Sequence, residues 1–348
     1  MGQANGPEAG ELTQALATRT ADIMGQPLQS WEPLAGGRGT ALRVGLAGGR
    51  SVIAKVPAEP GAFARTLIGI EYLDRLGLGD CCAALLGQDP EAELLVLESL
   101  DGPSLAELLL GGDSGAALSA LVAHAALLGD LAAASRGSTL PAEPPWFTPA
   151  ASFRELDGLL GRIGLRLDSM ARAELSGLEE WWQRDTAFTP ADTCPDNNAW
   201  SNGRLRLFDL DGSGFRNPAL EAAYHHVQWP TCWCLAELPE ELKGLPLKAF
   251  LERFPVSEAE IATADGAWAV LNLCWVLGLC LQEDPAMRSG LTTYRQMLVW
   301  RSLGSARSCR EQGVLPALSG LLEHFAARAR DLWPGSGEPI PLYPAFRP

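Results

Sequence analysis

Residues 190–200 read PADTCPDNNAW, and residues 205–213 read LRLFDLDGS. The first stretch places Asp192 and Asn197 five positions apart on a tight loop that contains proline. The second is a hydrophobic strand that ends in Asp209. Mg²⁺ requires hard oxygen ligands and usually keeps substrate phosphates in its shell, so Asn197 and Asp209 are candidate co-ligands. Asp192 could then accept a hydroxyl proton, although Asp and Asn also dominate turns and caps, which is the structural interpretation of either stretch alone.

A change of hydrophobic period marks the N-terminal part of the chain. Residues 11–25 have the pattern of an amphipathic helix, and residues 31–57 change to period two. They predict three short strands in an antiparallel meander. Its turns are rich in glycine, at Gly36-Gly37, Gly39 and Gly48-Gly49.

Lys55 ends the last of these strands, in the apolar run VIAK. The chain has only three lysines, Lys55, Lys243 and Lys248, so one that follows a glycine turn and an apolar strand is conspicuous. A solvated lysine at a strand edge is the simpler interpretation of this residue taken alone.

The remaining pattern predicts two lobes. Residues 63–78 have helical spacing, residues 85–100 predict a hairpin, and most of the chain after Ser104 is helical. We therefore expect an α+β protein with a small antiparallel β-rich lobe, one main helix in that lobe, and a large, mostly helical lobe. The predicted lobes are residues 1–99, in which residues 1–28 hold a leading helix, and residues 100–348.

The order of these features is that of protein-kinase-like phosphotransferases: glycine turn, strand lysine, helix, linker, D-x4-N loop and strand ending in Asp. At this point the chain resembles the aminoglycoside phosphotransferase family. The loop of that family commonly reads HGDxxPxN and its metal motif IDFE or similar, and here they appear as Pro190–Asn197 and Phe208–Asp211. The resemblance covers roughly residues 30–300 in motif order. It implies a bilobal protein-kinase-like fold whose first lobe binds a nucleotide.

The resemblance also implies a role for each matching residue. Lys55 would pair with the phosphates of ATP or GTP, Asp192 would orient the hydroxyl group of a small-molecule acceptor, and Asn197 and Asp209 would bind Mg²⁺. The implied reaction is direct, in-line phosphoryl transfer. The further nucleotide-binding residues would be the glycines that let the first turn approach the phosphates and the backbone groups that meet adenine, namely Gly36, Gly37, Gly39, Glu98 and Leu100.

Two departures from the family pattern define an alternative. Pro190 and Ala191 stand where the family has His and Gly, and Thr66 stands where similar sequences often carry the Glu that holds the lysine. Glu71, five residues later, is our candidate for that partner. Five helical residues turn through about 500°, so Glu71 and Thr66 lie on different faces and cannot be interchanged. Either Glu71 holds Lys55 or the lysine lacks its usual carboxylate, and the alternative function is a catalytically impaired kinase-like binding or regulatory module.

Charge and hydropathy exclude other classes of partner. The 42 acidic residues against 27 Lys and Arg give 27 − 42 = −15, and no basic stripe is present to track a phosphate backbone, so we expect no nucleic-acid partner. The most apolar stretch, residues 267–281, is shorter than the roughly 20 residues that span a bilayer. We read it as a buried helix and expect no membrane partner. The N-terminus carries no secretory signal pattern, so a cytoplasmic location is the default expectation.

Cysteines and acids in the helical part leave two questions open. Eight cysteines in a reducing compartment would remain thiols. Zinc ligation near Cys194, His225-His226 and Cys232-x-Cys234 is possible, but small buried side chains are the favoured interpretation. Acidic side chains, together with tryptophans, could attract a cationic acceptor, although a solvated helix surface explains each acid equally simply; these are Glu237, Glu240, Glu241, Glu283 and Asp284.

Overall fold

The computed structural model describes residues 7–34, 39–138 and 149–348, and the chain forms two compact units. The first unit consists of residues 1–102, 190–192 and 206–214, and the second of residues 103–189, 193–205 and 215–348. The first break, after residue 102, lies close to the predicted boundary. The two later segments of the first unit differ from that prediction, which assigned them to the helical part.

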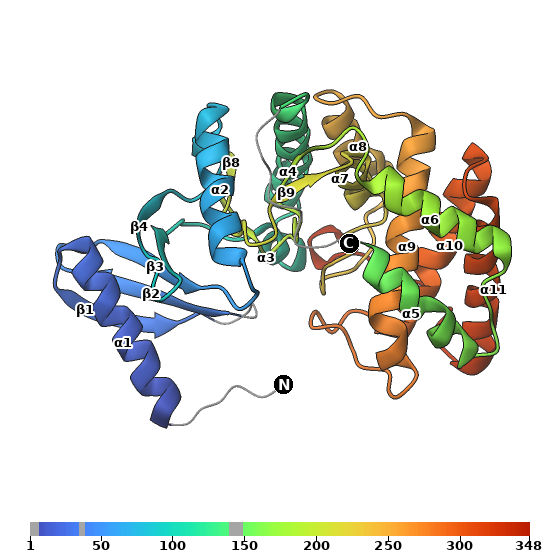
Figure 1. Ribbon diagram of the computed structural model, residues 1–348, viewed down its shortest axis with the longest axis horizontal. Helices are drawn as coiled ribbons and strands as arrows, with labels where there is room; N and C mark the ends of the chain where they lie inside the picture. The colour runs from blue at the N-terminus through green and yellow to red at the C-terminus, as the bar shows by residue number, and fades with distance from the viewer. Residues whose placement is uncertain (1–6, 35–38, 139–148) are drawn as a thin grey trace. The chain divides into compact units, whose positions relative to one another are not determined.

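The first unit contains a five-stranded antiparallel sheet with the order β1-β2-β3-β5-β4 (Figure 1). This confirms the predicted meander followed by a hairpin. Its strands are β1 (Leu28–Pro33), β2 (Thr40–Leu46), β3 (Ser51–Val56), β4 (Leu85–Asp89) and β5 (Leu94–Glu98).

Alternation along β2 decides which face of the sheet is buried. Leu42, Val44 and Leu46 are buried, while the residues between them are partly exposed. They pack with Ala17 and Ala21 of helix α1 (Pro7–Met24), so the leading helix covers one face of the sheet. Each large aliphatic side chain buried there stabilises the fold by about 1.5–3 kcal/mol.

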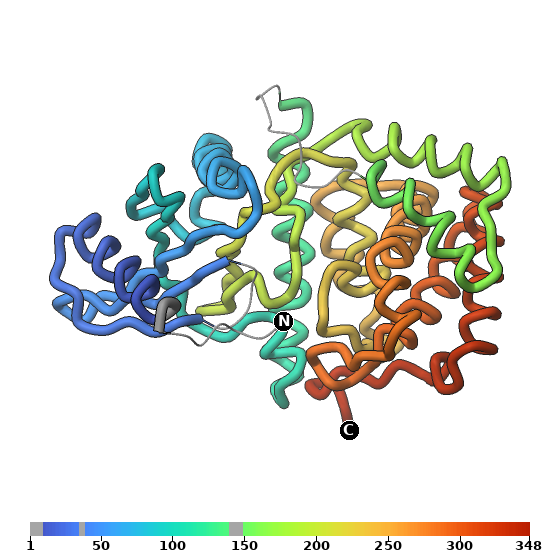
Figure 2. The backbone as a smooth tube through the Cα atoms, turned by 60° about the horizontal axis from the view of Figure 1, so that its bottom comes forward, coloured from blue at the N-terminus to red at the C-terminus, as the bar shows by residue number. Residues whose placement is uncertain are grey.

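The second helix of the first unit, α2 (Ala62–Arg75), follows β3 directly. Figures 1 and 2 show it on a different side of the sheet from α1. Gly61 precedes it with φ 74°, a conformation that L side chains rarely adopt. The sharp turn at Gly61 therefore connects the end of β3 to the start of α2 within a few residues.

The second unit is mostly helical, as predicted. Its helices are α3 (Leu105–Leu110), α4 (Ser114–Ser135), α5 (Pro149–Gly161), α6 (Ser169–Trp182), α7 (Ala219–His226), α8 (Gly244–Leu251), α9 (Glu258–Cys280), α10 (Tyr294–Gln312) and α11 (Pro316–Leu332). Helices α9, α10 and α11 lie side by side in Figures 1 and 2. Two short ribbons precede α7: β6 (Ala187–Thr189) pairs with β9 (Gly214–Arg216), and β7 (Asn198–Ser201) with β8 (Arg204–Leu207).

A buried arginine organises the helical core. Arg301 of α10 is 2% exposed, and its guanidinium donates hydrogen bonds to the carbonyl oxygens of Gln228 and Trp229 and to Oδ1 of Asn272. Burial lowers the pKa of Arg301 to about 10. A buried cation needs such partners, because an unpaired one costs several kcal/mol.

Two helices in the described chain, α4 and α9, are long and apolar enough to cross a membrane by length and composition alone. The core helices of soluble proteins pass the same test. In α9, 78% of the most apolar window is buried inside the protein. The run 267–281 that we predicted to be a buried helix belongs almost entirely to this element.

Candidate active site

Lys55 lies near the end of β3, between two paired strands. It is opposite Ala41 of β2 and Leu95 of β5, so the lysine stands on an inner strand rather than at the edge of the sheet. Its Nζ atom is 2.9 Å from Oδ1 of Asp209 and 2.8 Å from Oδ1 of Asp211. The structure therefore joins the strand lysine to the metal motif, across more than 150 positions of sequence, within the first unit.

Burial and charge act on this lysine in opposite directions. Its side chain is 15% exposed, and burial alone would lower the pKa of Lys55. The charges of Asp209 and Asp211 outweigh burial and raise the pKa above its usual value. Lys55 is thus a protonated ammonium group held by two carboxylates, which argues against a solvated lysine at a strand edge.

The cluster around Lys55 contains more acidic than basic groups. One ammonium faces two carboxylates, and burial together with the charge of Asp209 raises the pKa of Asp211. The sequence indicated Asp209 as the metal ligand in this motif. The structure brings both side chains to the same lysine.

Helix α2 holds the metal motif from the other side. Thr66 donates a hydrogen bond from Oγ1 to Oδ1 of Asp211, at 2.9 Å. Its neighbour Arg65 donates from Nε to the carbonyl oxygen of Asp211, at 2.7 Å, and Ser213 Oγ donates to the carbonyl oxygen of Arg65, at 3.0 Å. A Cβ on Gly69 would stand 2.6 Å from Ser213 Oγ, so a larger residue on that turn would push the motif away.

The expectation that Glu71 holds Lys55 is wrong in this structure. Glu71 is exposed on α2 and pairs with Arg75, one turn further along the same helix. Thr66 is 2% exposed and faces Asp211. The helical rotation between positions 66 and 71 explains the outcome, because only one of the two can face the lysine.

Asp192 is half-buried on a strained turn of the first unit. Its N–H donates to the carbonyl oxygen of Pro190 at 2.9 Å, and Ala191 between them has φ 63°. A hydrogen bond from residue i to i+2 across a positive φ is a γ-turn of the rare, strained kind. Glycine would adopt this backbone conformation without the strain that the Cβ of Ala191 introduces.

Asn197 belongs to the second unit, whereas Asp209 belongs to the first. The N–H of Asn197 donates to the carbonyl oxygen of Cys194, at 2.9 Å. The next residue, Asn198, is buried, and its Oδ1 accepts from the N–H of Leu105 at the start of α3. Asn198 therefore fixes the loop structurally, a role that the sequence pattern did not single out, and joint metal ligation by Asn197 and Asp209 stays a prediction.

The predicted nucleotide-binding residues meet different outcomes. Gly36 and Gly37 lie outside the described residues. Gly39 is required at the start of β2, because a Cβ there would collide with the carbonyl oxygen of Val56. This is a constraint of strand packing, and contact of Gly39 with a phosphate stays a prediction.

Both the side chain and the backbone N–H of Glu98, at the end of β5, form hydrogen bonds within the protein. Arg206 donates to both carboxylate oxygens, each at 2.7 Å, and the N–H of Glu98 donates to the carbonyl oxygen of Ala84 at 2.9 Å. The hydrogen bond from Arg206 lowers the pKa of Glu98. Adenine binding by backbone groups at Glu98 and Leu100 stays a prediction, and the anchoring role of Arg206 was missed from the sequence.

The cysteines correct a second expectation. Cys194 and Cys232 form a disulfide, so these two are not thiols. Cys234 Sγ lies 3.4 Å from Cys232 Sγ, and Asp196 Oδ2 accepts from Nε1 of Trp233 at 2.6 Å. The stretch that follows Asp192 is therefore bound covalently and by hydrogen bonds to residues 232–234.

Some of the acids suggested for a cationic acceptor already have partners. Glu237 accepts from Nε1 of Trp300 at 2.7 Å, and Lys243 lies 3.7 Å from Glu237 and 2.9 Å from Glu240. Asp284 Oδ1 accepts from the N–H of Arg295. These contacts favour the structural interpretation for the three acids.

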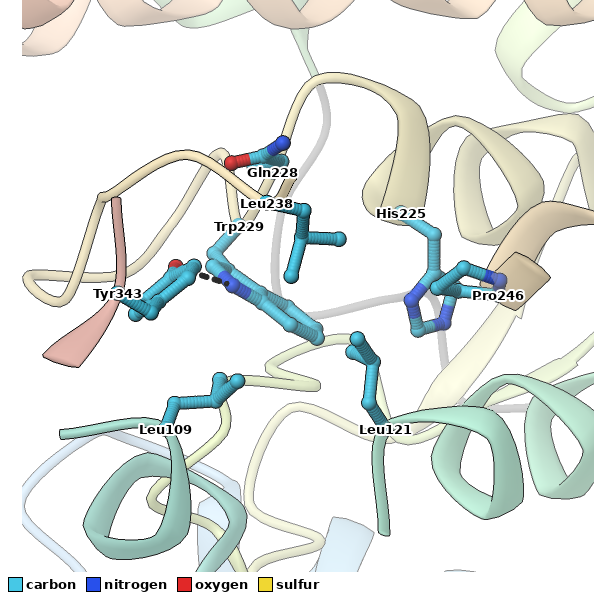
Figure 3. A pocket seen from close by; sticks show the side chains of 8 residues that line it. All are labelled: Leu109, Leu121, His225, Gln228, Trp229, Leu238, Pro246 and Tyr343. Atoms are coloured by element: carbon cyan, nitrogen blue, oxygen red, sulfur yellow. Dashed lines mark hydrogen bonds between the residues drawn. The ribbon is translucent and has the colours of Figure 1, made fainter. Parts of the chain in front are cut away.

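Two cavities in the second unit differ greatly in size. The one in Figure 3 is lined in part by Trp229, whose indole donates to the hydroxyl of Tyr343 at 2.8 Å. Its volume of about 10 Å³ holds at most one water molecule. The other has a volume of about 490 Å³, the size of a small-molecule site. It is lined by acidic and basic side chains, among them His226, Asp265, Arg307 and Glu311.

The donor set of the first unit fits a divalent cation. The side chains of Asp209 and Asp211 are 28% and 25% exposed, and the cluster contains two carboxylates for one ammonium group. Hard oxygen donors with residual negative charge are what Mg²⁺ binds. Bound there, Mg²⁺ would neutralise charge on nucleotide phosphates, while Lys55 would remain a second, fixed positive charge.

Comparison with known proteins gives a clear result at the level of the fold. No protein-family model and no curated protein matches the sequence. Among solved structures, the chain is similar to choline kinase LicA from Streptococcus pneumoniae, with 17% identity and a TM-score of 0.58 over 85% of this chain and 99% of that one.

Two further solved structures resemble the chain to a similar degree. One is amicoumacin kinase hAmiN in complex with AMP-PNP, Ca²⁺ and Ami, with 15% identity and a TM-score of 0.57 over 92% of this chain and 94% of that one. The other is a choline/ethanolamine kinase family protein from Mesorhizobium loti, with 16% identity and a TM-score of 0.52 over 92% and 99%. The chain thus has the protein-kinase-like fold found in choline kinases and aminoglycoside phosphotransferases.

Proposed function

We propose that this protein is a kinase of small molecules, which transfers a phosphoryl group from ATP or GTP to a hydroxyl group with the help of Mg²⁺. The observation that carries the proposal is the cluster of Lys55, Asp209 and Asp211, in which an ammonium group lies beside two carboxylates. Such a cluster suits a nucleoside triphosphate, whose transfer depends on positioning and charge neutralisation. Similar structures crystallised with AMP and with AMP-PNP support the nucleotide.

Each residue has a defined task in this proposal. Lys55 binds and orients the phosphates, and Asp209 and Asn197 hold the cation. Asp192 orients the acceptor hydroxyl and accepts its proton as the phosphoryl group transfers. No covalent intermediate with the protein is needed, so removal of the Asp192 carboxylate should stop transfer while nucleotide binding persists.

The acceptor is a small alcohol, and a cationic one is favoured by the net charge of −15. Solved structures with this fold are named for choline and for aminoglycosides, both of which carry hydroxyl and cationic nitrogen groups. An experiment that fits this proposal measures nucleoside diphosphate release with ATP or GTP, Mg²⁺ and a panel of amino alcohols and amino sugars.

The matched variants are Asp192→Asn and Asp185→Asn. Asp185 is exposed and has φ 51°, which Asn tolerates, so it controls for loss of one acid. We expect Asp192→Asn to lower acceptor-dependent turnover by about 10²–10⁴-fold, the range for loss of a positioned acid–base group, and Asp185→Asn to behave as wild type. Equal activity of the Asp192 variant would exclude the proposed mechanism.

A kinase-like module that binds nucleotide without transfer is the second candidate. The strained turn at Ala191, with Pro190 before it, favours this candidate because the loop lacks the residues that position the catalytic Asp in similar sequences. The same experiment separates the two. Mg-ATP that raises the melting temperature without any acceptor-dependent release would support the binding module.

A further inference from the structure

Lys55 has its countercharge on the metal motif instead of on helix α2. In this chain the helix position that faces the motif is Thr66, which is 2% exposed and carries no charge. The carboxylate in reach of the lysine and the threonine is that of Asp211, whose Oδ1 lies 2.8 Å from Lys55 Nζ and 2.9 Å from Thr66 Oγ1. One oxygen therefore receives both a charged and a neutral donor.

The backbone around this contact is held on both sides. Arg65 binds the carbonyl oxygen of Asp211 with its side chain, while the carbonyl oxygen of Arg65 accepts from Ser213 Oγ. The N–H of Asp211 donates to Oδ1 of Asp209, at 3.1 Å. Thr66 is thus fixed opposite Asp211, and its hydroxyl defines where the carboxylate of Asp211 points.

The donor count of lysine shows why a second carboxylate matters. An ammonium group has three N–H donors, and Asp209 and Asp211 take two of them among the described residues. A cation bound to Asp209 would compete with the lysine for that carboxylate. Asp211 would then be the anion that keeps Lys55 aimed, and two donors would be available to phosphate oxygens.

We propose that Asp211 is the permanent counter-ion of Lys55 and that Thr66 is the positioning residue that orients it. The inference rests on the proposed nucleotide site. A glutamate at position 66 would place a second negative charge against the carboxylate of Asp211, whereas the threonine hydroxyl donates a hydrogen bond to it.

The test compares Thr66→Val, which keeps the shape of the side chain but removes its hydroxyl, with Thr66→Ser, which keeps the hydroxyl. Thr20→Val is the matched control, because Thr20 is a buried threonine of α1 that donates to the carbonyl oxygen of Leu16, outside the cluster. Affinity for ATP with Mg²⁺ is measured by calorimetry. We expect about tenfold weaker binding for Thr66→Val, and wild-type binding for the Ser variant and the control.

A second measurement needs no nucleotide. Lysine-selective isotope labelling gives ammonium resonances for only three lysines, and Lys243 and Lys248 are 36% and 72% exposed. We expect a slowly exchanging resonance for Lys55, faster exchange in Thr66→Val, and restored protection in Thr66→Ser. Circular dichroism verifies that the variants are folded.

The two measurements fail in different ways. A wild-type protein that binds neither ATP nor GTP refutes the proposed function, while the ammonium resonance still reports on Thr66 and Asp211. Unchanged exchange and affinity in Thr66→Val would overturn the inference, as would a serine variant that behaves like the valine variant. A double variant, Thr66→Glu with Asp211→Asn, moves the carboxylate to the helix and should regain affinity lost in Asp211→Asn alone.

Discussion

Ala191 holds a backbone conformation with φ 63°, immediately before the proposed catalytic Asp192. The left-handed region costs an L-residue about 1–2 kcal/mol. Ala191 is also 5% exposed, and its Cβ is 3.3 Å from the point where a Cβ on Gly212 would lie. The residue thus combines backbone strain with tight packing directly before Asp192, and strained backbone of this kind clusters at functional sites.

Substitutions at this position should have unequal effects. Ala191→Val adds methyl groups to a packed site and a β-branched side chain at positive φ, so we expect it to lower the free energy of unfolding by about 2 kcal/mol. Ala191→Gly relieves strain of about 1–2 kcal/mol but loses a buried methyl of about 0.8 and adds chain entropy of about 0.5–1, so its net effect should stay within about 0.8 kcal/mol in either direction. Urea unfolding measures both, and a tolerated valine would contradict the strained turn.

The disulfide between Cys194 and Cys232 connects the loop after Asp192 to the segment that precedes α8. The two cysteines are 38 positions apart. Closing a loop of that length removes enough chain entropy from the unfolded state to stabilise the fold by about 4 kcal/mol. The connection should therefore govern both the stability of this loop and its position.

Two measurements check the disulfide. The denatured protein should show six reactive thiols without a reductant and all eight cysteines with one. Cys194→Ser should lower the free energy of unfolding by about 3–4 kcal/mol, whereas Cys274→Ser, at a half-buried free cysteine, should have a much smaller effect. Eight thiols before reduction would show that the bond does not form in solution.

A histidine–aspartate pair between helices α7 and α9 makes stability depend on pH. His226 Nδ1 lies 2.7 Å from Oδ2 of Asp265, which is fully buried and also accepts from Ser308 Oγ at 2.6 Å. The hydrogen bond to Asp265 raises the pKa of His226. A raised folded-state pKa means that the folded protein binds the proton more tightly than the unfolded chain.

The sign of the pH effect follows from that shift. The stabilisation from His226 should be fully present below about pH 6.5, the usual histidine pKa, and be lost as the pH rises through the folded-state pKa. The difference in free energy of unfolding between wild type and His226→Gln should therefore shrink toward alkaline pH. His324→Gln, at an exposed histidine of α11, is the control. A difference that grows with pH would contradict the ion pair.

At the scale of the whole molecule, the net charge of −15 opposes binding to other polyanions. We expect no retention of the protein on immobilised duplex DNA at moderate salt, measured by elution across a salt gradient. A reversed-charge test protein of similar size, with a basic surface, serves as the positive control. Salt-dependent retention of this chain would show that its few cations form a patch strong enough to displace counterions.

Much of the fold could be predicted because its patterns are local. Period-two alternation predicted the strands of the sheet, and the glycine turn at Gly48-Gly49 predicted the hairpin whose second strand carries Lys55. The order of the motifs predicted that Lys55 and Asp209 belong to the same site. What the sequence could not show is side-chain direction: whether Thr66 or Glu71 faces the lysine depends on how α2 is rotated against residues 209–213. The partner of Arg206 and the pairing of Cys194 likewise depend on contacts distant in sequence.

The last residues of the first unit are synthesised long after its sheet. Its sheet is encoded by residue 98, but residues 206–214, which supply Arg206 for Glu98 and both carboxylates for Lys55, come more than a hundred positions later. During synthesis on the ribosome, the strands of the sheet therefore emerge before Lys55 has its carboxylate partners. Those partners emerge only after much of the helical unit has been made. Domains usually fold as units during synthesis. Here the first unit can be completed only after part of the second unit has been synthesised. The residues that complete it include the two carboxylates proposed to act at the nucleotide site.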